Sequence, residues 1–505
     1  MAECVVCALC ALIILKPQEF IPALLVVPIV YLAFGAALLC IGVGFVLRSL
    51  KPRLSPATPF VCAFFAWGLL TTLVKKHAVF GEELTTFSIV MGVYLCVSVG
   101  LASSFGLRAF MVMFIACAAL VTDVAIEQNS GPFGCFVGAA DDWEGKGEMA
   151  YDGRPCETAA DCRENSLNPS ANYRCEKVGP LSTSSIGGRV RYRGSLADPN
   201  ELSLMISLAI PFTLAIIEVF REQRKKRPRS WGDGINAPAD RKPPAPEAPG
   251  VVETAAKGEA ASPTIIVRST PLLRSIPAAA LLTAIGFTVI LARSRSGLIV
   301  FLLVIGISFI RKVGAWGLVA GCFIAPPMLL LGGRSGSEAD DSADERAQLL
   351  REGFEFIRKT HGIGLGTHQF TDESSIGLTA HNAYLLAAAE TGIIGFLLFG
   401  FAVYLSLKVP YALWFGGYRL KPATTNFATA LALALTGATV GIFFLSWTYK
   451  DILYMLFGAS AALYGVARSE DPKVRIGLSG FEALVVVVGL FTLLVAIYLA
   501  ARFHH

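Results

Sequence analysis

The chain has 505 residues, of which 54% are hydrophobic and 16% are charged, and its mean hydropathy is +0.59. The formal net charge is only +5, which gives no case for nucleic-acid binding. The apolar residues form runs of about 18–25, the length that spans a bilayer, and do not alternate as the strands of a membrane β-barrel do. The composition therefore excludes an ordinary soluble enzyme and predicts an all-α, polytopic integral membrane protein.

Thirteen apolar segments are candidate transmembrane helices, and a count of twelve is equally acceptable because 3–16 is short and 297–310 is marginal. No basic residue precedes the first segment, which is unlike a cleavable signal peptide, so we interpret it as a membrane anchor. The thirteen segments are 3–16, 21–47, 57–74, 86–104, 108–126, 199–220, 273–292, 297–310, 314–331, 382–409, 423–446, 452–467 and 478–501.

Basic residues predict the orientation, because cytoplasmic loops are enriched in Lys and Arg. Arg48, Lys51, Arg108, the run 221–229 and Arg311 all fall on one side when the spans are counted. This side is the inside, and the N-terminus lies there too. The run REQRKKRPR is expected to act as a stop-transfer signal, with contact to anionic lipid as the alternative.

This topology predicts the organisation of the chain. The segment 221–271 is rich in Pro, Ala and charged residues and cannot bury a core, so we expect it to be disordered. The predicted units are N-terminal transmembrane helices (1–126), an external Cys-containing loop (127–198), a transmembrane helix (199–220), an internal linker (221–271), further transmembrane helices (272–331), an external loop (332–380) and C-terminal transmembrane helices (381–505).

The twelve cysteines fall into two groups. Eight lie within apolar runs and are expected to be small buried packing residues. The other four, Cys135, Cys156, Cys162 and Cys175, lie in the external loop, where an oxidising compartment favours two disulfides with three possible pairings. A metal site is the weaker alternative, because the spacings do not match a zinc pattern.

Residues 381–395, HNAYLLAAAETGIIG, give the strongest functional signal. A His and a Glu are costly in an apolar segment and need a reason. His381 is expected to open the helix, to share a face with Tyr384 and Leu385, and to act as a general base. A hydrogen-bonded His at a helix start is the alternative. Glu390 lies roughly 180° around this helix and about 13 Å along it, so we expect it to pair with a polar group on another helix.

The external loop before His381 contains an amphipathic pattern. Ser342 and Glu345 have the spacing of a capping box, which predicts a helix start. Arg346 falls on the apolar face of that helix, where it would face either an acidic partner or an anionic ligand. The expected stripe consists of Arg346, Leu349, Leu350, Gly353, Phe354 and Ile357.

The stretch HGIGLGTHQF at 361–370 predicts a tight turn or a close backbone approach at its glycines. It is not a P-loop, because no GK[ST] follows. A metal held by His361 and His368 with Asp372 or Glu373 is conceivable, but loop histidines are usually solvated and we expect that here.

The stretch RGSLADPNE at 193–201 predicts another helix start, with Asp198 as N-cap, Pro199 at N1 and Glu201 at N3. A helix N-terminus at the outer face is favourable for phosphate. Arginines gather at such external helix ends, and they suggest a site for a pyrophosphate whose lipid tail lies in the bilayer. Interfacial snorkelling is the alternative. These residues are Arg189, Arg191, Arg193, Arg293 and Arg295.

Taken together, these motifs resemble the O-antigen ligase and O-antigen polymerase family of bacterial membrane glycosyltransferases. The likeness is clearest over residues about 290–400, which contain ARSRSGL, DER with its amphipathic helix, GIGLGTHQF and HNAYLLAAAETGIIG. RGSLADPNELS at 193–203 resembles an earlier Arg and Asn motif of the family. The Cys-containing insert and the long linker are not part of the usual pattern.

The resemblance implies a fold like that of the C-type glycosyltransferases and an inverting, metal-independent transfer without a cofactor. The donor would be a glycan on undecaprenyl pyrophosphate, and the acceptor lipid A–core or another carrier-linked glycan. His381 would be the catalytic base, and Arg193, Arg346 and Arg295 would hold the pyrophosphate. Asn382, Glu390, Asn200 and Tyr384 would support the site. The protein would lie in the bacterial inner membrane among its lipids, with its active face in the periplasm.

Several functions stay open at this point. We favour a ligase, but a polymerase needs the same base and the same anion site. A protein-directed oligosaccharyltransferase is a third enzyme. A polysaccharide transporter or lipid flippase is the alternative of another class, although transporters more often show repeat symmetry and charges near mid-membrane.

Overall fold

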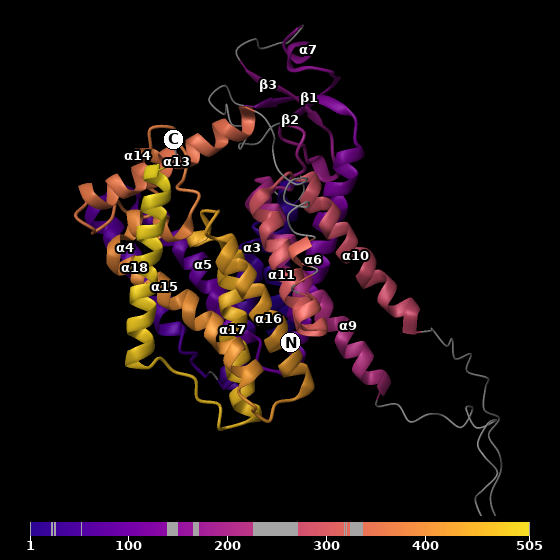
Figure 1. Cartoon of the computed structure of the whole chain (residues 1–505), viewed down its shortest axis with the longest axis vertical. Helices are drawn as coiled ribbons and strands as arrows, with labels where there is room; N and C mark the ends of the chain where they lie inside the picture. The colour runs from indigo at the N-terminus through magenta and orange to yellow at the C-terminus, as the bar shows by residue number, and fades with distance from the viewer. Residues whose placement is uncertain are drawn as a thin grey trace, which may run out of the picture.

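The computed structural model describes residues 2–21, 24, 27–51, 53–138, 150–164, 171–225, 271–317, 319, 321–323 and 337–503. Most of the expected linker 221–271 lies outside the described residues, as does the part of the loop 332–380 that precedes residue 337. The described chain is a bundle of helices with one small sheet (Figure 1). The expected polytopic, mostly helical fold is confirmed, and the sheet is an addition to the all-α expectation.

Ten helices of the described chain are long and apolar enough to cross a membrane. The other three expected spans are 3–16, which forms a helix of 14 residues, 273–292, whose apolar part is the shorter Ile276–Leu291, and 314–331, which is only partly described. The principal helices are α1 (Ala2–Leu15), α3 (Ile29–Val46), α4 (Thr58–Lys75), α5 (Phe80–Gly100), α6 (Ser104–Ser130), α8 (Pro199–Leu208), α9 (Ile210–Lys225), α10 (Pro271–Leu291), α11 (Arg295–Val313), α13 (Ser337–Lys359), α14 (Phe370–Glu373), α15 (Ala383–Phe415), α16 (Pro422–Gly441), α17 (Asp451–Glu470) and α18 (Gly480–Phe503).

The core of the bundle is aromatic where α4, α5 and α17 meet. The ring of Phe65 lies 5.1 Å from that of Phe87 and 4.8 Å from that of Tyr454. Tyr449, in the short segment η6 (Trp447–Tyr449), lies 5.1 Å from Phe87. Aromatic pairs at these separations add to the free energy of burial. They fix η6 against α5.

The sheet, α13 and the C-terminal end of α18 lie at the same end of the bundle, which we call the upper end, and the N-terminus lies toward the other (Figure 1). Arg351 in α13 donates a hydrogen bond of 2.9 Å to the carbonyl oxygen of Ala501, near the end of α18. The loop before α15 and the loop between α16 and α17 also meet there, because the hydroxyl groups of Thr379 and Ser446 lie 2.6 Å apart. The motifs before α15 therefore share one end with the sheet.

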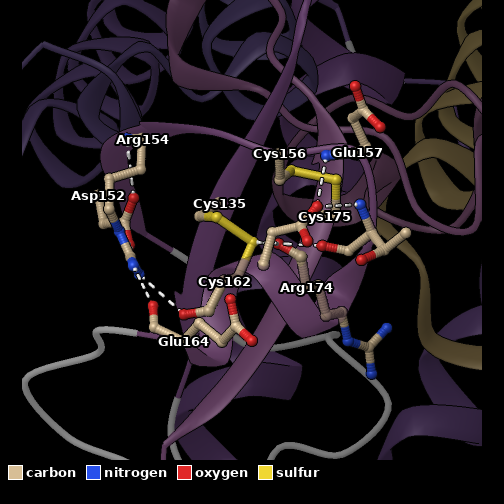
Figure 2. The surroundings of a disulfide bond; sticks show 11 residues. Cys135, Asp152, Arg154, Cys156, Glu157, Cys162, Glu164, Arg174 and Cys175 are labelled. Carbon is tan, nitrogen blue, oxygen red and sulfur yellow. Dashed lines mark hydrogen bonds and ion pairs between the residues drawn. A yellow bond between two sulfur atoms is a disulfide. The ribbon is translucent and has the colours of Figure 1, made fainter.

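The sheet is antiparallel, with strand order β2-β1-β3 formed by β2 (Ala150–Pro155), β1 (Phe133–Gly138) and β3 (Asn172–Lys177). One of the three possible cysteine pairings is present, with Cys135 bonded to Cys162 and Cys156 to Cys175 (Figure 2). Cys162 lies in the short helix α7 (Ala159–Arg163), so the bond to Cys135 holds this helix against β1. The disulfides supply the stability that so small a core lacks.

The helix α13 begins at Ser337, so the prediction of a start at the Ser342–Glu345 capping box is wrong. That spacing also occurs inside helices, and here the helical segment continues upstream of it. The expected apolar stripe is confirmed, because Leu349 is fully buried and α13 packs against α15 and α18. At Gly353 a side chain would meet Leu385 at 2.8 Å, which explains the small residue in the stripe.

Helix α15 is broken at Gly392, where φ is 69° and ψ is −175°. A break inside a membrane helix leaves backbone groups without partners, and these must be satisfied within the protein. The glycine loop 362–366 supplies most of them. Leu365 N donates to Ala389 O and Gly366 N to Glu390 O, both at 3.0 Å, while Ile393 N donates to Gly362 O at 2.9 Å.

The break needs glycine on both sides of the contact. Gly364 has φ +104°, and a Cβ there would collide with the carbonyl oxygen of Glu390 and lie 2.6 Å from the amide nitrogen of Gly392. A Cβ at Gly392 would collide with the carbonyl oxygens of Gly362 and Ile363. Trp67 completes the arrangement by donating its indole N–H to Thr391 O at 2.8 Å. The motifs GIGLG and ETGIIG are therefore two halves of one contact.

We expect Gly364→Ala to destabilise the protein more than Gly377→Ala does. Both glycines have positive φ, +104° and +68°, so both variants carry the same kind of backbone strain, about 1–2 kcal/mol. Only Gly364 faces neighbouring backbone atoms, which adds about 1–3 kcal/mol of overpacking, whereas Gly377 has nothing within 4 Å. Thermal unfolding of the purified variants in detergent measures the difference. Equal losses of stability would contradict the described contact.

Candidate functional site

His381 lies at the upper end, directly before α15, with a half-buried side chain. It does not open the helix, because Asn382 is the N-cap and its Oδ1 accepts hydrogen bonds from Tyr384 N and Leu385 N. His381 has φ +48°, so the expectation that it shares a helix face with Tyr384 is wrong. A non-glycine residue in this conformation is uncommon, and such residues cluster at functional sites.

The loop 442–448 fixes the segment that directly follows His381. Ala383 N donates to Ile442 O at 2.9 Å, and Asn382 Nδ2 donates to Phe443 O at 2.9 Å. Thr448 Oγ1 donates to Ala383 O at 2.9 Å. The side chain of His381 thus projects from a segment that is held by the neighbouring loop rather than from a free end.

The expected arginines meet at a cavity of about 110 Å³ at the upper end. Arg295 lies in the first turn of α11 and is exposed, and Arg346 reaches the cavity from α13. Asn200, near the start of α8, completes the set of predicted residues there, and Arg293 joins them. The cavity therefore brings together two segments that are distant in the sequence, one at residue 200 and the other within residues 293–346. The full lining is Asn200, Arg293, Arg295, Ser296, Ser342, Ala343 and Arg346.

The start of α8 has the expected geometry. Asp198 is the N-cap and accepts a hydrogen bond from Asn200 N at 2.7 Å, and Pro199 occupies the first turn. Asn200 Nδ2 also donates to Asp198 Oδ1 at 2.9 Å. Glu201 forms an ion pair of 3.0 Å with Lys450, which follows η6. This pair ties the start of α8 to the loop that holds His381.

Arg193 lies apart from the other expected arginines, in a second cavity of about 820 Å³ between the sheet and the bundle. Its Nη1 donates to Glu19 O at 2.7 Å, and its Nη2 donates to Ser182 O. Within the described chain, His381 is not among the residues that line either of these two cavities. The structure thus brings Arg295, Arg346 and Asn200 together, and places Arg193 at the other cavity.

Glu390 and Tyr384 lie inside the protein. Glu390 is 2% exposed and accepts a hydrogen bond of 2.9 Å from Phe370 N, so its partner is a backbone group at the start of the short helix α14. The hydroxyl of Tyr384 donates to Thr439 O at 3.1 Å. Both side chains hold the segments that surround His381.

A second buried acid, Glu83, was missed by the sequence analysis. It is 6% exposed and accepts hydrogen bonds from Thr367 Oγ1 at 2.9 Å and from His368 Nδ1 at 2.8 Å. The ring of His368 packs on Tyr449, with ring centroids 4.7 Å apart. Glu83 begins the apolar stretch ELTTFSIV, and an acid in such a stretch needs a polar partner. This pattern could have predicted a buried pair. His368 is thus paired with a buried acid, although part of its side chain is exposed to solvent as expected.

The pKa of His368 follows from these neighbours. Burial opposes protonation of the ring, but the hydrogen bond to Glu83 and the negative charges of Glu390 and Glu83 outweigh it, although Lys450 acts in the opposite sense. The pKa of His368 is therefore raised above its ordinary value. Because 42% of the side chain is exposed, solvent screening keeps the effect on stability small.

The cysteines of the sheet form the one group of metal-ligating type found in the described chain, with Cys135, Cys156 and Cys162 close together. Their sulfur atoms are already in disulfides and do not offer thiolates. At the glycine loop, His368 is paired with Glu83, and Glu373 with Lys76 at 2.8 Å.

We expect the stability of the protein to fall between pH 6 and pH 8, and His368→Gln to reduce that fall. The raised pKa of His368 in the folded state means that its protonated form stabilises the fold below its unfolded pKa of about 6.5. This contribution, about 0.5–1 kcal/mol at such exposure, is lost as the pH rises through the folded pKa. Thermal unfolding of wild type and variant at both pH values measures it.

The matched control for this measurement is His361→Gln, because His361 is also exposed and also has positive φ. Its pH profile should follow that of the wild type. If the stability of His368→Gln depends on pH in the same way as that of the wild type, the pair of His368 and Glu83 is not the source of the fall in stability.

Comparison with known proteins identifies the family of the part that holds these residues. Residues 278–400 match the family model described as O-antigen ligase, and they contain Arg293, Arg295, Arg346 and His381. No curated protein matches the chain. Enzymes of this family are ligases and polymerases that transfer glycans, and their substrates are lipid-linked glycans. The chain is therefore a multi-pass membrane protein whose residues 278–400 match the O-antigen ligase family model.

Proposed function

We propose that the protein transfers a glycan from undecaprenyl pyrophosphate to an acceptor hydroxyl, with lipid A–core as the acceptor of a ligase. The observation that supports this proposal most is the cavity between α8, α11 and α13. Three arginines line it, and all three lie within the matched residues 278–400. Guanidinium groups bind phosphate oxygens through paired hydrogen bonds, so such a cavity suits a pyrophosphate.

In the proposed reaction His381 is the general base. It removes the proton from the acceptor hydroxyl while the hydroxyl oxygen attacks C1 of the sugar that is joined to the carrier. The bond between C1 and the pyrophosphate oxygen breaks with inversion at C1, and undecaprenyl pyrophosphate leaves with the bonding electron pair. Arg295 and Arg346, together with Arg293, would stabilise the charge that develops on the leaving group. No step in this scheme calls for a metal ion.

The surroundings of His381 support its role as the base. Its side chain is half-buried, its backbone is held in a rarely used conformation, and the loop 442–448 fixes the residues that follow it. Histidine suits such a role, because it is the side chain whose unperturbed charge change lies between pH 5 and pH 8. In this proposal Asn382 and Tyr384 position the base as the N-cap and as a buried anchor, and Glu390 holds the glycine loop.

Transport is the alternative of another class, and the break in α15 is the one feature that favours it, since transporters coordinate ions at discontinuous helices. Here the freed backbone groups around Gly392 already bond to the loop 362–366 and to Trp67. They are therefore not available to coordinate an ion. We propose transfer at the periplasmic face of the bacterial inner membrane, because the arginine cavity and His381 both lie at the upper end.

His381→Ala is expected to abolish glycan transfer, by at least about a hundredfold for loss of a general base, without loss of the inserted protein. The measurement is the surface glycan profile of a deletion strain complemented with wild type, His381→Ala or His361→Ala. His361 is the matched control, because it is another exposed loop histidine with positive φ. Normal surface glycan in the His381→Ala strain would refute its role as base.

The same deletion strain separates ligase from polymerase. Loss of all capped lipopolysaccharide, with long glycan on the carrier, would identify a ligase, and lipid A–core that bears a single repeat would identify a polymerase. An unchanged profile in the deletion strain would exclude both and turn attention to another polysaccharide or to transport.

Arg346→Ala is expected to reduce transfer by about tenfold or more, the loss of one charged hydrogen-bonding partner of phosphate. Arg358→Ala is the matched control, because Arg358 is exposed on the same helix and does not line the cavity. Transfer from purified lipid-linked glycan by reconstituted protein measures both. Equal rates of transfer by Arg346→Ala and Arg358→Ala would show that the cavity is not part of the proposed site.

A further inference from the structure

The second cavity, about 820 Å³, lies where the disulfide-bonded sheet meets the helix bundle. Its volume falls within the range of about 300–1,000 Å³ that small-molecule sites have. Tyr151 of β2 and Phe136 of β1 line it from the sheet, Tyr192 and Arg193 line it from the segment that leads into α8, and Glu19 lines it from the segment after α1. The sheet is therefore one wall of a site-sized cavity.

The chemistry of this lining suits a carbohydrate. A sugar ring has an apolar C–H face, which packs on aromatic rings, and a rim of hydroxyl groups, which need donors and acceptors. Tyr151 is 47% exposed and its ring lies 5.5 Å from that of Phe136. Arg193 and Glu19 provide donors and a carboxylate, and the hydroxyl groups of residues 182–184 lie along the same wall.

The cavity is formed before any ligand binds. Tyr192 donates its hydroxyl to Leu15 O at 3.0 Å, and Arg193 donates to Glu19 O at 2.7 Å, so the floor is tied to the end of α1. The main chain of Arg191 is fixed by Gln128 Oε1 at 2.9 Å, from the end of α6. On the other side one disulfide ties α7 to β1, and the other ties the residue that follows β2 to β3. A rigid cavity binds with a smaller loss of entropy.

The two cavities are neighbours along the chain. Ala197 lines the larger one and Asn200 lines the arginine cavity. Asn200 is three positions after Ala197, so their Cα atoms are at most about 11 Å apart. A glycan attached to a pyrophosphate in the arginine cavity could thus extend past the start of α8 into the larger one.

We propose that the larger cavity binds the carbohydrate chain of a lipid-linked substrate, with the Cys-containing insert as its aromatic wall. This inference rests on the proposed function, since it takes the arginine cavity as the site of the pyrophosphate. The oligosaccharide belongs either to the donor or to the acceptor, and Tyr151 contacts it in both cases. This aromatic wall lies within residues 127–198, outside the residues 278–400 that match the O-antigen ligase family model.

The test is glycan binding by the purified full-length protein in lipid nanodiscs, measured by calorimetry. The first probe is the oligosaccharide released by mild acid from the host's lipid-linked donor, and the second is the oligosaccharide released from its lipid A–core. Tyr151→Ala should raise the Kd of one probe about three- to tenfold through the loss of ring stacking. Tyr151→Phe keeps the ring and should bind within about twofold of wild type.

Phe133→Ala is the matched control, because Phe133 is an aromatic of the same sheet with a similar exposure, 44%, and does not line the cavity. It should bind like the wild type. Intact disulfides on a non-reducing gel would show that Tyr151→Ala keeps the sheet. Equal binding by Tyr151→Ala and Phe133→Ala, or no binding of either probe by wild type, would overturn the proposal.

The two probes also identify the source of the glycan. An effect of Tyr151→Ala on the first probe assigns the cavity to the donor, and an effect on the second assigns it to the acceptor. Binding that depends on Tyr151, in a protein whose transfer does not depend on His381, would keep this inference and refute the proposed mechanism.

Discussion

The arrangement of the upper end depends on backbone hydrogen bonds at the break in α15. A membrane helix that loses its i to i−4 bonds at Gly392 would leave buried carbonyl and amide groups without partners, at a cost of several kcal/mol for each group. The loop 362–366 and the indole of Trp67 take up these groups. Both the loop and the broken helix need glycine at this contact, because no Cβ fits between their backbones.

This contact fixes more than the helix. The loop 362–366 begins directly after α13, which carries Arg346, and it is followed by the segment that ends at His381. The side chains of Glu83 and Glu390 hold the next residues, 367–370, from α5 and α15. The two buried acids therefore hold the loop in place. The hydrogen bonds that they accept from it offset the energetic cost of burying them. Along the chain, Arg346 of the proposed anion site precedes this loop, and His381, the proposed base, follows it.

Much of the fold followed from the sequence. The length and hydropathy of the apolar runs predicted the helices, and Asp198 and Pro199 marked a helix start that the structure confirms. The capping box at Ser342 and the helical placement of His381 were wrong, because such short spacings do not fix where a helix begins. The sheet was not predicted, since its short strands owe their stability to disulfides that a pattern of hydropathy does not reveal. At the site, residue types indicated an anion cavity, but only the packing of α8, α11 and α13 separates Arg193 from Arg295 and Arg346.

The ion pair between Lys450 and Glu201 has a consequence for specificity. Residues 442–450 hold the backbone next to His381 at one end and, through Lys450, the start of α8 with Asn200 at the other. This short loop therefore sets the spacing between the proposed base and the proposed pyrophosphate cavity. Related proteins that act on bulkier or slimmer acceptors would be expected to differ in the length or sequence of this loop, while the reacting groups stay the same.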